Sequence, residues 1–137
     1  MTERAAQEAL IHVMVTMSAA DRTMTDDEMQ TIGDLVRRLP VFGGFAPDDL
    51  VAVARQTAAL LSDEETGLEL VLSTIRSALP ERLHETAYAL AVEVAAADLR
   101  VEQEELRFLQ MLRDRLDLDK LAVAAIERSA RVRYRRG

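Results

Sequence analysis

Two stretches of the chain repeat one pattern: residues 18–29 read SAADRTMTDDEM and residues 95–106 read AAADLRVEQEEL. They align without a gap at an offset of 77 residues, which places Asp21 on Asp98 and Glu28 on Glu105. Each copy has an alanine-rich helix end, an aspartate, a short turn with one apolar residue, and a glutamate that opens a second amphipathic helix. The repeat therefore predicts two helix-turn-helix units with an acid on each side of the turn.

The rest of the chain is also patterned as helix. Apolar residues recur at helical spacing, and no alternation is long enough for a strand. Pro40 disfavours helix in the residue before it, Pro47 and Pro80 suit helix starts, and Thr25/Glu28 and Ser62/Glu65 read as capping boxes. The predicted helices are about 3–20, 25–39, 47–61, 62–79, 80–97, 102–116 and 119–135. They predict a single compact all-α domain over residues 1–137.

Composition limits the core and its chemistry. Hydrophobic residues make up 49% of the chain but aromatic residues only 4%, and there is no Trp or Cys. The core must therefore be aliphatic, with Phe42 and Phe45 folded back onto it, and disulfides and cysteine-based metal sites are excluded. Of the two histidines, His12 lies among apolar residues and is predicted at the edge of the core, and His84 is predicted at the surface.

The charge distribution bears on partners and location. A net charge of −7 argues against a general nucleic-acid binder, because phosphate contacts need clustered cations. The N-terminal segment does not resemble a secretory signal, and no apolar run is long enough to cross a bilayer, so a cytoplasmic protein is expected. Cations gather near the C-terminus, where they either complement a helix dipole or meet an acidic partner or membrane surface: Arg128, Arg131, Arg133, Arg135 and Arg136.

The acids of the repeated turns differ in how well a purely structural role explains them. Asp21 and Asp98 sit at predicted helix C-termini, where a carboxylate faces the negative end of the dipole and needs a compensating positive charge. Glu28 and Glu105 occupy first turns, where acids are favoured. Glu28 also has a capping-box partner, whereas the second copy has Glu102, a poor N-cap, at the matching position.

A fifth acid, Glu93, interrupts the apolar run of the fifth predicted helix. A buried carboxylate there needs a cation, a donor or a proton, and an ion pair with an arginine of another helix is the alternative to a metal. Carboxylate and carbonyl oxygens suit hard cations, with calcium or magnesium favoured. The turn from Asp21 to Glu28 is too short for an EF-hand and has neither its glycine nor its regular alternation of oxygen donors, so a metal site would draw on both copies or on water. The candidate ligands are Asp21, Glu28, Glu93, Asp98 and Glu105.

The doubled pattern resembles the TerB-like tellurite-resistance family. The runs ALIHVMVTMSAADRTMTDDE and TAYALAVEVAAADLRVEQEELRFL carry most of the resemblance, which covers nearly the whole chain. It implies a bacterial, cytosolic helical module linked to tellurite resistance and stress responses, with metal bound through paired acidic turns at Asp21, Glu28, Asp98 and Glu105. Many members follow the aspartate with Gly, where this chain has Arg22 and Leu99.

Two functional hypotheses follow. The first is a metal-responsive binding module, in which a divalent cation settles the acidic turns and presents a surface to a protein partner. The second is a metal-free scaffold or adaptor, in which the acids cap helices and pair with arginines. Catalysis is not expected, because the sequence has no phosphate-binding glycine loop, nucleophile elbow or HExxH arrangement. The oligomeric state is left open.

Overall fold

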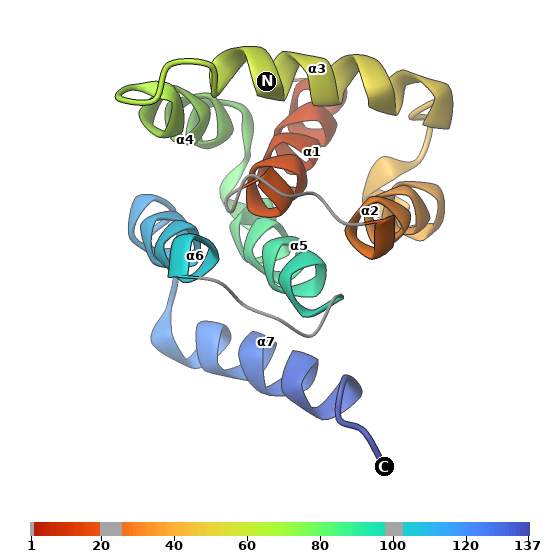
Figure 1. The fold of residues 1–137 in the computed structure, drawn as a ribbon, viewed down its shortest axis with the longest axis vertical. Coiled ribbons are helices and arrows are strands. Elements are labelled where there is room, and N and C mark those ends of the chain that lie inside the picture. Colours follow the sequence, from red (N-terminus) through yellow and green to blue (C-terminus); the bar gives the residue numbers. More distant parts are fainter. Residues whose placement is uncertain (1, 20–25, 98–102) are drawn as a thin grey trace.

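The computed structural model describes residues 2–19, 26–97 and 103–137 (Figure 1). Within these ranges the chain forms seven α-helices and no β-strand, which confirms the all-α prediction. The helices are α1 (Glu3–Ala19), α2 (Asp26–Arg38), α3 (Leu50–Leu60), α4 (Gly67–Ala78), α5 (His84–Ala96), α6 (Gln103–Arg115) and α7 (Lys120–Arg133). No helix in the described ranges is long and apolar enough to cross a membrane.

Most predicted helix ends agree with the structure within a few residues, but three starts were wrong. Pro47 and Pro80 lead into the short 3₁₀ turns η2 (Pro47–Asp49) and η3 (Glu81–Leu83) instead of opening α3 and α5 directly. The predicted Ser62/Glu65 capping box does not form. Asp63 accepts hydrogen bonds from the backbone nitrogens of Glu65 and Thr66, and α4 begins only at Gly67. An aspartate side chain accepts a hydrogen bond from the backbone N–H two residues later more readily than a serine side chain does, so Asp63 forms the turn and Ser62 does not.

The repeat in the sequence is reproduced in the helix boundaries. Helix α2 ends at Arg38 and α6 ends at Arg115, so their C-terminal ends differ by 77 residues. The last helical residues of α1 and α5 are Ala19 and Ala96, which are separated by the same interval. The described ends of these helices next to and beyond each turn therefore follow the spacing of the repeat, whereas α1 and α5 begin at Glu3 and His84, which are not in register.

The helices form two similar groups of three, α1–α3 and α5–α7, whose first helices pair in the middle, and α4 is the seventh. Helices α1 and α5 pack against each other in the middle, with α2 and α6 beside them (Figure 1). Helix α2 contacts α5 and α6 contacts α1, so each second helix also touches the first helix of the other group. Helix α3 lies across α1, as α7 lies across α5, and α4 packs on α1 and α3.

The core is aliphatic, as the composition predicts. Leu10, Met14 and Met17 of α1 and Leu112 of α6 are among its fully buried side chains. The prediction for the connection between α2 and α3 is confirmed. Phe42, in the 3₁₀ turn η1 (Pro40–Phe42), and Phe45 are both buried, with ring centroids 6.3 Å apart in an edge-to-face arrangement.

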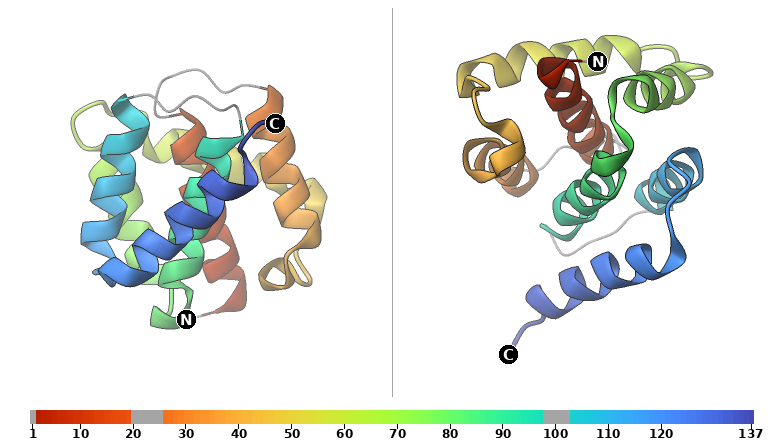
Figure 2. Two further views of the ribbon diagram at one scale, coloured as in Figure 1. Left: turned by 90° about the horizontal axis from the view of Figure 1, so that it is seen from below. Right: turned by 180° about the vertical axis from the view of Figure 1, so that it is seen from behind.

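The topology brings the described helix ends that flank both turns to one end of the molecule. The C-terminal ends of α1 and α5 and the N-terminal ends of α2 and α6 lie at the same end, opposite the N-terminus of the chain (Figure 2). We call this end the turn pole. The C-terminus lies on this side as well.

Candidate functional site

Glu28 and Glu105 are buried at matching positions of the turn pole. Each side chain lies in the first turn of its helix, α2 or α6, and each residue is only 2% exposed. The first turn leaves backbone N–H groups without helical partners and carries the positive end of the dipole, so a carboxylate is stabilised there. Burial makes a carboxylate depend on interactions within the protein. Both glutamates do engage in such interactions.

The other acids of the turns cannot be placed. Asp21 and Asp98 lie outside the described residues, as do Thr25, the predicted capping partner of Glu28, and Glu102. The described helix ends on either side of each turn belong to the turn pole (Figure 2).

Glu93 is held by an arginine of another helix. Arg133 Nη2, at the end of α7, donates to both carboxylate oxygens of Glu93, at 2.9 and 3.0 Å. The neighbouring Tyr134 hydroxyl has a raised pKa because of burial and its hydrogen bond to Glu93. Of the two explanations for Glu93, the ion pair is the one that the structure displays.

The donor chemistry of the turn pole suits a hard cation, but the described residues alone do not complete a site. Glu28 and Glu105 offer carboxylate oxygens, the ligands that calcium and magnesium take. Within residues 2–19, 26–97 and 103–137 there is no group of three or more His, Cys, Asp or Glu side chains placed to hold a metal ion. A metal site at this end would therefore need Asp21, Asp98 or water in addition to the two glutamates.

A polar cluster that the sequence did not reveal joins α5, α6 and α7. The buried Tyr88 donates its hydroxyl hydrogen to Glu127 Oε2, and Arg113 Nη1 donates to the Tyr88 hydroxyl at 2.9 Å and to Glu127 Oε2 at 3.2 Å. Burial and the Glu127 carboxylate raise the pKa of Tyr88 to about 12. Arg113 and Glu127 read in the sequence as ordinary polar positions of amphipathic helices, so no local signal marks this cluster.

The buried histidine is part of a structural chain of hydrogen bonds. Thr57 Oγ1 donates to the carbonyl of Val53 at 3.0 Å, so it accepts from His12 Nδ1–H at 2.7 Å. Burial lowers the pKa of His12, which favours the neutral ring. His12 thus lies in the core, close to its predicted place, whereas His84 is half-buried, with Nε2 3.4 Å from the Leu79 carbonyl oxygen.

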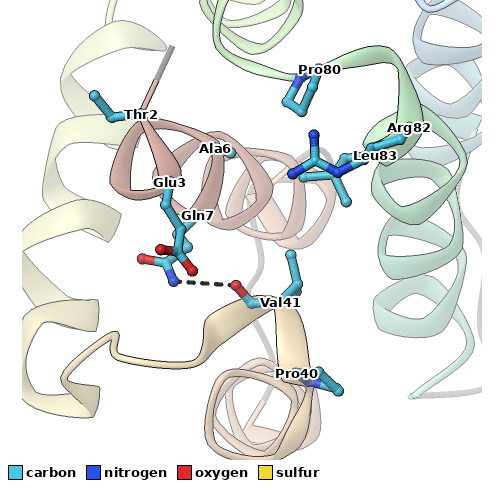
Figure 3. A pocket seen from close by; sticks show the side chains of 9 residues that line it. All are labelled: Thr2, Glu3, Ala6, Gln7, Pro40, Val41, Pro80, Arg82 and Leu83. Atoms are coloured by element: carbon cyan, nitrogen blue, oxygen red, sulfur yellow. Dashed lines mark hydrogen bonds between the residues drawn. The ribbon is translucent and has the colours of Figure 1, made fainter.

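A cavity of about 590 Å³ lies near the N-terminus, away from the turn pole (Figure 3). Its polar side chains come from Thr2, from Glu3 and Gln7 of α1 and from Arg82 of η3, and two prolines contribute to its walls. Gln7 Nε2 is bound by the carbonyls of Val41 and Gly43, at 3.2 and 3.0 Å. The amide therefore fastens η1 to α1.

Together these features define an all-α module built on a duplicated helix-turn-helix with buried acids at one end. The family model described as tellurite resistance protein TerB matches residues 7–128. The chain therefore belongs to the TerB family. No curated protein and no solved structure gave a significant match to it.

Proposed function

We propose that this protein is a metal-responsive module that binds a divalent cation, calcium or magnesium by preference, at the turn pole. The observation that carries the proposal is the burial of Glu28 and Glu105 at equivalent places, each 2% exposed and each in the first turn of a helix at this end. Membership of the TerB family supports a role associated with tellurite resistance, and a wider role in stress response is part of the proposal.

The proposed ligands are the acids on both sides of each turn. Asp21 and Asp98 follow α1 and α5, whose C-terminal dipoles disfavour a bare carboxylate, and a cation would remove that penalty. The glutamates would contribute from the opposite side of each turn. Glu93 is a reserve ligand in this scheme, since it would first have to leave Arg133.

The proposal includes a cytoplasmic location and a protein partner, with no nucleic acid and no catalytic role. The acidic net charge of −7 supports the exclusion of nucleic acid. The bonding of His12 to Thr57 and the lowered His12 pKa argue against the buried imidazole as a general base.

The alternative function is a metal-free scaffold or adaptor that binds a protein partner. Two observations favour it: arginines of other helices bind Glu93 and Glu127 directly. Arg22, next to Asp21, could neutralise the first turn in the same way. In this alternative the acids are stabilising elements, and an exposed helix face does the binding.

Thermal unfolding with EDTA and with added calcium, magnesium, manganese or zinc tests the proposal. A cation that binds only the folded state stabilises it by about 2.7 kcal/mol at about one hundred times its dissociation constant. We expect a rise in melting temperature with calcium or magnesium, and metal content after purification without chelator. A melting temperature that none of the four metals changes, in a folded sample, would contradict metal binding and favour the adaptor function.

Paired variants locate the metal response. Asp98→Asn should abolish most of the shift while sparing the metal-free fold, and Glu105→Gln should reduce it. Glu104→Gln is the matched control, because Glu104 is an exposed neighbour in the same helical turn. An equal metal response in Glu104→Gln, Glu105→Gln and Asp98→Asn would place the ion elsewhere.

A further inference from the structure

A groove lies between α5, α6 and α7. It has a volume of about 550 Å³ and is open on one side, and we call it the α7 groove. Each helix supplies residues at helical spacing: Val92, Ala95 and Ala96 from α5, Leu106, Leu109 and Arg113 from α6, and Glu127, Ala130, Arg131 and Tyr134 from α7 and its end, with Arg135 beyond. Helices α5 and α6 lie side by side and α7 crosses α5 (Figure 1), so the groove lies between a pair of neighbouring helices and a crossing one.

Leu106 leaves apolar surface uncovered in this groove. It lies three residues before the buried Leu109, on the same face of α6, yet 51% of it is exposed. The equivalent residue of the first copy is Met29, which is 46% exposed and does not line the groove. Leu106 and Met29 are therefore similarly exposed, but only Leu106 lines the α7 groove.

Among the described residues, the lining of the groove holds three arginines and one acid. That acid, Glu127, is already bound by Tyr88 and Arg113. Arg131 and Arg135 lie four residues apart on the α7 side, and neither forms an ion pair within the part of the chain that the structure describes. A ligand that fits must bring an anionic group to these guanidinium groups.

We propose that the α7 groove binds a single-chain amphiphile with a carboxylate head, of the fatty-acid class. The volume falls within the range of about 300–1,000 Å³ that is usual for small-molecule pockets. The acyl chain lies against Leu106, Leu109 and the alanines of α5, and burying it removes the exposed surface of Leu106 from water. The carboxylate meets Arg131 and Arg135, since guanidinium groups bind carboxylates with charge-assisted hydrogen bonds. This proposal is independent of the metal.

Isothermal titration of the full chain with laurate, kept below its micelle concentration, tests the proposal. We expect saturable binding of one laurate per chain. Acetate has the head without the chain, and dodecyltrimethylammonium has the chain with the opposite charge, so neither should bind or displace laurate. Binding of the cation as tight as that of laurate, absent binding, or uptake without saturation would each refute the proposal.

Two variants and their matched controls locate the laurate. Leu106→Glu places a carboxylate in the groove and should weaken binding at least about tenfold, whereas Met29→Glu, at the equivalent position, should change it less than about twofold. The pair Arg131→Gln and Arg135→Gln should weaken binding by a similar factor, and Arg128→Gln with Arg136→Gln should leave it unchanged. Equal effects of the groove variants and their controls would contradict the assignment.

Two further measurements complete the test. Circular dichroism establishes that each variant is folded, and the arginine variant carries the test if Leu106→Glu is not, because its residues are exposed. Vesicles of phosphatidylcholine with phosphatidylglycerol separate a free amphiphile from a membrane surface. Binding to the vesicles without binding of monomeric laurate would show that the arginines meet a bilayer and would refute the fatty-acid site.

Discussion

Individual buried polar side chains in this protein are stabilised in different ways. Glu28 and Glu105 are placed at helix N-termini, where the dipole favours a carboxylate, whereas Tyr88 is stabilised by an arginine and a glutamate of other helices. His12 is bonded through Thr57 to the α3 backbone, and burial lowers its pKa, which favours the neutral ring. In each case a suitable partner lowers the free-energy cost of burying the polar group.

His12 should make the protein less stable under mildly acidic conditions. The pKa of the unfolded residue is about 6.5, and burial lowers the pKa in the folded state. Below about pH 6.5 the unfolded chain therefore binds more protons than the folded one. The contribution of His12 to the free energy of unfolding is complete above about pH 6.5 and is lost as pH falls. We expect the free energy of unfolding, measured with urea between about pH 7.5 and 5.5, to fall less in His12→Gln than in the unmodified protein.

His84→Gln is the control for that measurement. It removes the only other histidine, which is half-buried, and should leave the loss of stability on acidification as large as in the unmodified protein. Parallel pH profiles for His12→Gln and the unmodified protein would contradict the assignment.

At the scale of the helices, the turn between α3 and α4 depends on a glycine for space. A Cβ on Gly67 would lie 2.9 Å from both the Cα and the carbonyl oxygen of Leu61, closer than real contacts allow. The first residue of α4 therefore lies directly against the last turn of α3, where Asp63 also binds the backbone. This close approach sets the position of α4.

Gly67→Ala should destabilise the protein by about 1–3 kcal/mol, because backbone atoms have to move to admit the methyl group. Gly33→Ala provides the contrast within α2. Its Cβ would meet Arg37 only at 3.6 Å, an ordinary contact, and alanine in a helix interior gains up to about 1 kcal/mol over glycine. Urea unfolding should show opposite signs for the two variants, and a shared sign would be inconsistent with the geometry.

At the scale of the whole molecule, the repeat includes a third helix that the sequence does not show. Helix α3 crosses α1 as α7 crosses α5, although α2 and α3 are joined by residues 39–49 and α6 and α7 by the shorter 116–119. The two outer helices differ in packing. Helix α7 has grooves on both sides and contains a single buried residue, Ala130.

Helix α7 should accordingly open more easily than the central pair. In native-state hydrogen exchange we expect the slowest amides in α1 and α5 and faster exchange in α7, because local opening is easiest where little is buried. Glu93→Gln breaks the ion pair with Arg133 and should further speed exchange at the end of α7. Glu69→Gln, which breaks a comparable pair with Arg115 between α4 and α6, should not affect α7. Protection of α7 equal to that of α1 would contradict this.

The sequence by itself determined the helical class, the aliphatic core and the in-register pair of acidic turns, because these depend on periodicity and local spacing. It could not place the start of α4, because the Ser62 hydroxyl donates to the Ala59 carbonyl instead of capping α4, and Asp63 accepts from the backbone N–H of Glu65. Only the tertiary structure decided the partner of Glu93, the Tyr88 cluster and the α7 groove. These join side chains 14 to 40 residues apart, and helical periodicity does not specify which faces of distant helices meet.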